Sequence, residues 1–161
     1  MNRKIYWATV LLTISLMESC VSFKIQPSPD PENQVDTIVL CKRIEQREGL
    51  LFPGESLVEF KPDFGPIHCF IRLKNVNQTI RLKWKWYAPE GRLYRETKEV
   101  IVNSEPIYLE VVTAYDQIEL KPEEFDEGWW TVVVWVNGKL IGRRTFQLVG
   151  NGSPISATLE H

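Results

Sequence analysis

The feature that most constrains the fold is a stretch near the C-terminal end, residues 127–148, which reads EGWWTVVVWVNGKLIGRRTFQL. Two runs rich in β-branched and aromatic residues meet at Asn137-Gly138, a dipeptide that accepts positive φ at both central positions of a type I′ turn. An Asn-Gly pair between two such runs is the strongest short-range signal for a β-hairpin. Because an isolated hairpin is only marginally stable in water, these two strands must belong to a larger sheet.

Both faces of this hairpin are apolar, and its register decides which face is the core. With regular pairing across the turn, Phe146 lies on the opposite face from Trp130. A bulge at Gly142 moves Phe146 to the Trp130 face, which then becomes the core. The other face carries three large apolar side chains, those of Trp129, Val133 and Trp135. We expect these to point outward and bind a partner, since contiguous exposed apolar surface marks interaction sites. The alternative is burial beneath a loop, the first strand or the acidic segment.

The rest of the domain is also patterned for strands. Residues 80–87 alternate most cleanly, with apolar side chains on one face and basic ones on the other. Six Trp and ten Pro suit an all-β protein with aromatic core positions and proline-marked turns. We expect about eight short strands and no helix, which predicts an all-β antiparallel sandwich or a small barrel. The expected strands are residues 37–44, 56–60, 67–74, 80–87, 93–102 and 107–114, followed by the hairpin, with residues 46–54 as a connection and residues 116–127 as an acidic loop.

Three stretches resemble immunoglobulin-like (Ig-like) domains. Residues 84–94, WKWYAPEGRLY, resemble their W-x-x-P-x-G-x-x-Y pattern, in which a core Trp strand precedes a Pro-Gly turn. Residues 128–146 resemble their closing hairpin, and residues 67–75 resemble the hydrophobic strand that ends in Leu-Lys-Asn. The resemblance is to bacterial extracytoplasmic Ig-like β-sandwich domains of unknown function, often lipid-anchored. It implies an Ig-like antiparallel β-sandwich of about 7–8 strands, and because the motifs are structural it implies no activity.

The N-terminal segment predicts export. A short positive stretch is followed by an uncharged apolar run, residues 5–17, of the length of a signal-peptide core. Cys20, in the sequence LMESC, resembles the lipid-modified first residue of a mature bacterial lipoprotein, although Glu18 departs from the small residue preferred there. The competing interpretations are ordinary cleavage near Ser22, and a buried N-terminal strand or helix. We expect an extracytoplasmic protein of the periplasm or cell envelope, held to the membrane by lipid at Cys20.

The chain therefore divides into four segments. The first is the signal peptide and the second a proline-rich spacer with nothing to bury, which we expect to be extended. The third is the Ig-like domain, and the fourth is a polar tail whose last three residues resemble the remnant of an expression tag. Their bounds are residues 1–22, 23–34, 35–149 and 150–161.

Two further cysteines, Cys41 and Cys69, lie in strand-like runs. With Cys20 lipidated or removed they are an even number in a compartment that permits disulfides, so we expect a bridge between them. The alternative is two buried free thiols, which behave as small hydrophobic side chains.

No constellation in the sequence indicates catalysis. His68 precedes Cys69, but adjacent residues of a strand point to opposite faces of a sheet. One histidine and two cysteines make a poor zinc site. The sequence contains no glycine-rich phosphate-binding motif and no nucleophile elbow. The acidic residues 123–127 match no calcium-binding loop and are expected to be solvated. We expect no enzyme activity, no metal and no cofactor.

Arg81, Lys83 and Lys85 form a basic stripe on one face of their strand. The stripe is interpreted either as a docking face for an acidic protein or polysaccharide, or as a solvated face that prevents edge-to-edge aggregation. The net charge of −2 and the exported location argue against nucleic acid. We expect a cell-envelope binding module whose partner is an envelope protein or a glycan. The alternative is a small protease-inhibitor-like or carbohydrate-binding domain that acts through loops 89–91 and 116–127.

Overall fold

The computed structural model describes residues 30, 34–61, 65–105, 107–120 and 126–150. The strands of these residues are β1 (Val35–Cys41), β2 (Ile44–Arg47), β3 (Leu50–Pro53), β4 (Glu59–Phe60), β5 (Ile67–Val76), β6 (Ile80–Tyr87), β7 (Leu93–Glu96), β8 (Val100–Val102), β9 (Leu109–Ile118), β10 (Gly128–Val136) and β11 (Lys139–Leu148), with one 3-10 turn, η2 (Pro89–Gly91). Among them no helix is long and apolar enough to cross a membrane. The expected signal peptide with Cys20, nearly all of the spacer and the tail lie outside the described residues.

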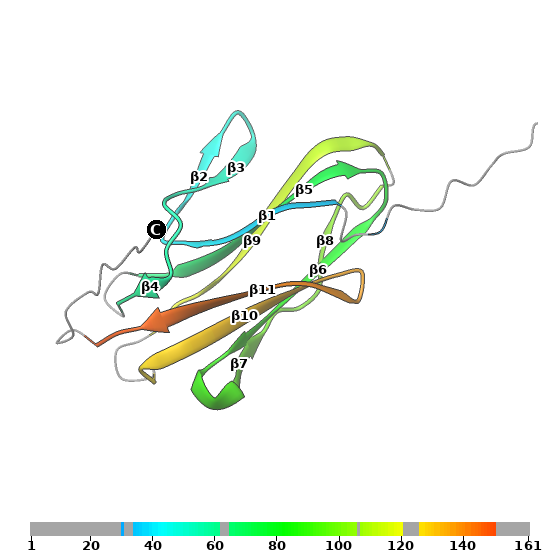
Figure 1. Cartoon of the computed structure of the whole chain (residues 1–161). Coiled ribbons are helices and arrows are strands. Elements are labelled where there is room, and N and C mark those ends of the chain that lie inside the picture. The colour runs from blue at the N-terminus through cyan, green and yellow to red at the C-terminus, as the bar shows by residue number, and fades with distance from the viewer. Residues whose placement is uncertain (1–29, 31–33, 62–64, 106, 121–125, 151–161) are drawn as a thin grey trace, which may run out of the picture.

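The strands form an Ig-like antiparallel β-sandwich, as expected. One sheet has three strands in the order β1-β5-β9. The second has six: β4, β11, β10 and β6 in order, with β7 and β8 both paired to β6. All pairs are antiparallel except β4 with β11. Figure 1 shows the sheet of β1, β5 and β9 above the sheet that contains β10 and β11, and the separate hairpin β2–β3 at one end, next to β1.

The core lies between the two sheets and is centred on aromatic side chains. Phe146 stacks on Trp130 with 6.2 Å between ring centroids, and meets Phe60 edge-on at 5.5 Å. Trp86 packs edge-on against the same ring at 6.2 Å. All four side chains are fully buried. Aromatic pairs of this geometry contribute beyond the area they bury, so Phe146 is the centre of the packing.

The closing hairpin contains the bulge that the sequence analysis considered. Asn137 and Gly138 have φ of 50° and 80°, as a type I′ turn requires. Trp135 pairs with Leu140 but Val134 pairs with Gly142, so one residue, Ile141, is extra in β11. Trp130 then faces Phe146, and the Trp130 face is the core face.

The position of Gly142 leaves no room for a side chain. A Cβ atom added there would lie 2.4 Å from Cδ1 of Ile38, on β1 of the opposite sheet. Nearby, Arg144 donates a hydrogen bond of 2.7 Å from Nε to the carbonyl oxygen of Ile38. The small residue therefore lets β1 approach β11 closely.

Three segments differ from the sequence expectation. Residues 93–102 were expected as one strand, but they form two, β7 and β8, separated by residues 97–99. Residues 46–54 were expected as a connection, but they form most of the hairpin β2–β3, whose turn at Glu48-Gly49 has φ of 51° and 79°. Glutamate rarely adopts positive φ, so the sequence does not signal this turn. Residues 116–127 were expected as a loop from Asp116 onward, whereas β9 continues to Ile118 and Asp116 is buried. From the sequence alone Asp116 indicates a loop, because the buried side chains that it pairs with cannot be identified there.

The expected disulfide between Cys41 and Cys69 is not formed, and both thiols are free and buried. Cys69 pairs in register with Leu40, whereas Cys41 pairs with His68. The two cysteines are therefore neighbours on adjacent strands whose side chains point to opposite faces of the sheet. Burial raises the pKa of the Cys69 thiol to about 12, against a smaller opposing effect of the Trp84 indole. Burial of Cys41 likewise raises the pKa of the Cys41 thiol.

Candidate functional site

The candidate site is the face of the six-stranded sheet that points away from the core, called the outer face below. It is formed by alternate residues of the three central strands β6, β10 and β11. Cross-strand pairing arranges their side chains in rows. The rows are Lys83–Trp135–Leu140, Lys85–Val133–Arg143 and Tyr87–Thr131–Thr145. The fold therefore brings the basic stripe and the apolar face of the hairpin onto one surface, which the sequence treated as two separate features.

A shallow groove of about 370 Å³ runs over this surface. Trp129 is 62% exposed and Leu140 is 42% exposed, while Trp135 is half-buried. Val133 was expected to point outward, and it does, but only 6% of it is exposed. Its neighbours in register, Lys85 and Arg143, are long side chains that cover apolar surface with their stems. Val133 is thus the floor of the groove, and Trp129 and Leu140 are its accessible apolar contacts.

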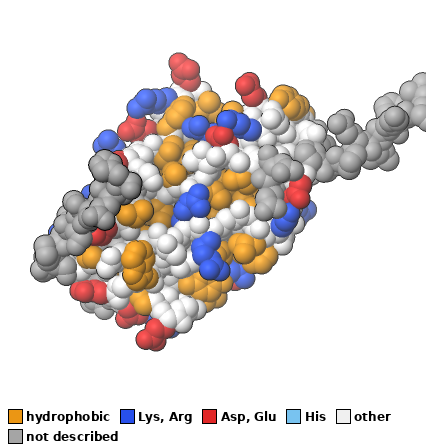
Figure 2. Space-filling model, in the orientation of Figure 1, with side chains coloured by type: hydrophobic (Ala, Val, Ile, Leu, Met, Phe, Trp, Pro, Cys, Tyr) orange, Lys and Arg blue, Asp and Glu red, His pale blue; other side chains and the backbone are white. Residues whose placement is uncertain are grey.

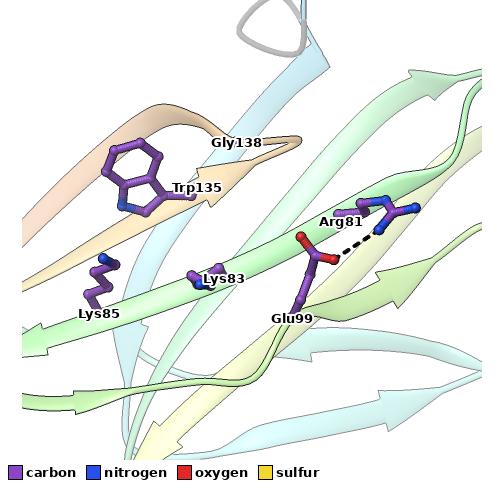
Figure 3. A pocket seen from close by; sticks show the side chains of 6 residues that line it. All are labelled: Arg81, Lys83, Lys85, Glu99, Trp135 and Gly138. Carbon is purple, nitrogen blue, oxygen red and sulfur yellow. Dashed lines mark hydrogen bonds and ion pairs between the residues drawn. The ribbon is translucent and has the colours of Figure 1, made fainter.

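A second hollow of about 190 Å³ adjoins the groove, and Trp135 lines both. Figure 3 shows the Trp135 ring above the ammonium group of Lys85, with Lys83 and Arg81 following along β6. The Lys85 Nζ atom lies 5.8 Å from the centre of the Trp135 ring, within range of a cation–π interaction. Apolar and cationic groups therefore meet at Trp135.

The basic stripe is mostly neutralised by carboxylates. Glu96 binds Lys83 at 2.7 Å and Lys85 at 3.4 Å, and Glu99 binds Arg81 at 3.1 Å. The hydrogen bond from Lys83 lowers the pKa of Glu96, and the same bond raises the pKa of Lys83. The stripe alone therefore presents little unpaired charge, which favours its interpretation as a solvated face.

Arg143, which the sequence analysis did not single out, changes the charge of the surface. Arg143 lines the groove and forms no ion pair with a carboxylate among the described residues. With Arg143, the outer face has four cations and three carboxylates: Glu96, Glu99 and Glu59, which lies on the edge strand β4 and pairs in register with Gln147. In Figure 2 the hydrophobic side chains of the visible face form separate patches between Lys and Arg side chains. The position of Arg143 on the outer face depends on the bulge in β11, because without the bulge Arg143 would point inward.

The other candidate side chains, those of His68, Cys41 and Asp116, are buried and packed within the fold. His68 does not face Cys69 but lies opposite Cys41, and both side chains are buried. The sequence missed this pair because the register of β1 on β5 cannot be read from spacing. Asp116 accepts a hydrogen bond of 2.6 Å from Trp86 Nε1 and an ion pair of 3.0 Å from Arg95, joining the two sheets.

The two candidate loops are only partly described. Arg92, after η2, forms an ion pair with Asp126 of the acidic segment, but residues 121–125 lie outside the described residues. In the part of the chain that the structure describes, no group of three or more His, Cys, Asp or Glu side chains is arranged to hold a metal ion.

No protein-family model matches the chain, and no curated protein matches it in sequence. A similar solved structure is an immunoglobulin-like protein of Pseudomonas aeruginosa, with 18% identity and a TM-score of 0.43 over 72% of this chain and 95% of that one. Another is the alkylpurine DNA glycosylase AlkC of Pseudomonas fluorescens bound to DNA with an abasic site analogue, with 12% identity and a TM-score of 0.44 over 71% of this chain. A third is a β-glucosidase of Listeria innocua, with 13% identity and a TM-score of 0.39 over 58% of this chain.

The chain spans 30% of the glycosylase and 15% of the glucosidase. The TM-scores are below 0.5, so these likenesses carry no functional argument.

Proposed function

We propose that this protein is a non-catalytic binding module of the bacterial cell envelope, exported by its N-terminal apolar segment, residues 5–17, and held to the membrane by lipid at Cys20. It binds a partner protein through the outer face of the six-stranded sheet. The observation that carries this proposal is the groove, where exposed Trp129 and Leu140 lie beside Arg143, which has no carboxylate partner in the described part of the chain. Trp and Arg are enriched among the residues that supply most of the binding energy at protein interfaces.

The rigidity of the surface supports the same function. The groove residues Trp129, Val133, Trp135, Leu140 and Arg143 stand on paired strands rather than on loops. The turn of the hairpin is also fixed to β6: Asn137 Oδ1 accepts a hydrogen bond of 2.8 Å from the Arg81 amide. A surface that is already ordered loses little conformational entropy when it binds.

Photo-crosslinking in intact cells tests the site. A photoreactive amino acid at position 129 or 140 of the full chain is expected to give a discrete protein adduct. The same group at position 58 is the matched control, because Val58 is 71% exposed but lies outside the outer face. Absence of adducts at 129 and 140, or equal adducts at 58, contradicts the proposal.

Anchoring at Cys20 is tested separately by metabolic labelling with a fatty acid. The full chain is expected to be labelled and to fractionate with membranes, and the Cys20→Ser variant is expected to lose the label. Label that persists in the variant contradicts modification at this cysteine. Loss of the anchor leaves the binding surface intact, so crosslinking at position 129 in the variant separates the two claims.

A further inference from the structure

We infer that the partner segment on the outer face is an extended acidic peptide strand, with apolar side chains on either side of a carboxylate. This inference rests on the proposed function and names the chemistry of the occupant. It follows from three properties of the surface: its charge, an unsatisfied donor at its centre, and the spacing of its rows.

The charge of the surface favours an acidic occupant. Arg81, Lys83 and Lys85 share two carboxylates, and Arg143 has none among the described residues. The chain as a whole has a net charge of −2, so the positive excess is local to this face. A second copy of the chain would place two such faces against each other, and like charges across an interface are strongly unfavourable. Charge complementarity therefore selects a different, acidic partner.

A buried donor at the centre of the surface also lacks an acceptor. The indole Nε1 of Trp135 is buried and makes no hydrogen bond within the described part of the protein. Trp135 lines both hollows, and the ammonium of Lys85 lies over its ring. An unsatisfied buried N–H is costly, and a cation beside it cannot accept a hydrogen bond. A small rotation of the indole toward a carboxylate or carbonyl oxygen of the occupant would satisfy it.

The rows of the outer face set the spacing of the occupant. Lys85 and Arg143 flank Val133 from the two neighbouring strands, about 10 Å apart. A carboxylate above Val133 is therefore within reach of both cations. Along β10, Trp135 lies about 7 Å to one side and Trp129 about 13 Å to the other. In an extended peptide these separations correspond to apolar side chains two positions before and four positions after the acid, or in the reverse direction.

Strong binding by Arg143 requires its planar guanidinium rather than charge alone. Two parallel N–H donors match the two oxygens of a carboxylate, whereas the ammonium of lysine is a single point charge. Arg143 is exposed, and glutamine keeps part of the aliphatic stem that covers Val133, so the Arg143→Gln substitution is expected to leave the fold intact. This residue therefore provides the most specific test.

The test is selection of a random heptapeptide library on the full chain, purified from membranes in detergent. Selected peptides are expected to share an acid with flanking apolar residues, and to bind about tenfold more weakly to Arg143→Gln. Arg143→Lys is expected to recover part of this loss, and Val58→Ala to bind as the parent protein does. Affinity is expected to fall as salt is raised, because the pairing is exposed.

Selection of neutral or basic peptides, or equal binding by Arg143→Gln, overturns the inference. So does the selection of no peptide, or binding of oligosaccharides alone. The proposed function is judged by crosslinking at position 129 in cells. Adducts there without acidic peptides in the selection leave the binding module standing and remove only the acidic occupant.

Discussion

Both sheets carry apolar side chains on the face that points away from the core, but only one of these faces is covered by another segment of the chain. On the three-stranded sheet, Cys41, His68 and Phe70 point away from the core, yet all three are buried. The hairpin β2–β3 lies against this face: the Leu51 amide donates a hydrogen bond to Thr113, and Phe52 packs beneath Arg72, with its ring centre 5.8 Å from the guanidinium carbon.

The outer face of the six-stranded sheet has a similar excess of apolar side chains but no described segment of this kind over it. Trp129 and Leu140 consequently remain exposed. A strand that is apolar on both sides requires a second covering layer, which is supplied by the chain itself or by a partner. We therefore expect binding on the outer face of the six-stranded sheet, because no described segment of the chain covers it.

The largest expected effect distinguishes two adjacent tryptophans. Trp130→Ala removes a side chain that stacks on Phe146 in the core, and we expect it to reduce the free energy of unfolding by about 3–5 kcal/mol. Trp129→Ala removes a side chain that is 62% exposed, and we expect a change of about 0.5 kcal/mol or less. Urea unfolding of both variants measures the difference. Similar losses in the two would show that the hairpin faces are not distinct.

The second prediction concerns Asp116, which joins the sheets. Asp116→Ala leaves the buried Trp86 indole without its acceptor and Arg95 with only the carbonyl oxygen of Gln117, and we expect a loss of about 2–4 kcal/mol. The matched control is Asp126→Ala, which breaks an ion pair with Arg92 whose side chains are 60% and 61% exposed. That change should cost less than about 1 kcal/mol. Thermal unfolding that shifts equally in both variants would contradict a special role for the buried acid.

The third prediction tests the close approach of the two sheets at the bulge. Gly142→Ala would place a Cβ against Ile38, and we expect a destabilisation of about 1–3 kcal/mol from the enforced shift. The double variant with Ile38→Val, which removes the colliding methyl, should recover part of this loss. Equal stability of the single and double variants would show that contact with the Ile38 methyl group does not cause the destabilisation.

The fourth prediction is a pH dependence from the inner face of the three-stranded sheet. Burial raises the pKa of the Cys69 thiol from 9.0 to about 12, so folding favours the neutral form. This contribution is complete below pH 9 and is lost as the pH rises toward 12. Between pH 8 and 10 we expect Cys69 to cost about 1.4 kcal/mol of stability. Cys69→Ala should remove this part of the decline, and an unchanged decline would refute it.

Sequence patterns predicted the sandwich because they are local. Period-2 alternation in residues 80–87 and Asn137-Gly138 each specify a strand or a turn from their own chemistry. Prediction of the bulge would also require knowing that Phe146 lies with Trp130 in the core. The sequence is compatible with both registers of the hairpin, because the choice between them depends on packing between the two sheets.

Properties that depend on register could not be predicted. Spacing alone does not reveal that Cys41 and Cys69 point to opposite faces, or that Asp116 lies beside Trp86. For the candidate site, exposure of Trp129 follows from its side of the hairpin, whereas burial of Val133 depends on neighbours from two other strands. The pairing of Lys83 and Lys85 with Glu96 is likewise tertiary, and so is the position of Arg143 in the groove.

The central claim is that a partner covers the outer face in the cell. Hydroxyl-radical footprinting of Trp129, in the purified full chain and in intact cells, tests it most directly. We predict rapid oxidation of Trp129 in the purified protein and strong protection in cells, with the exposed Tyr108, 64% accessible, equally reactive in both. Equal oxidation of Trp129 in the two preparations would contradict the claim.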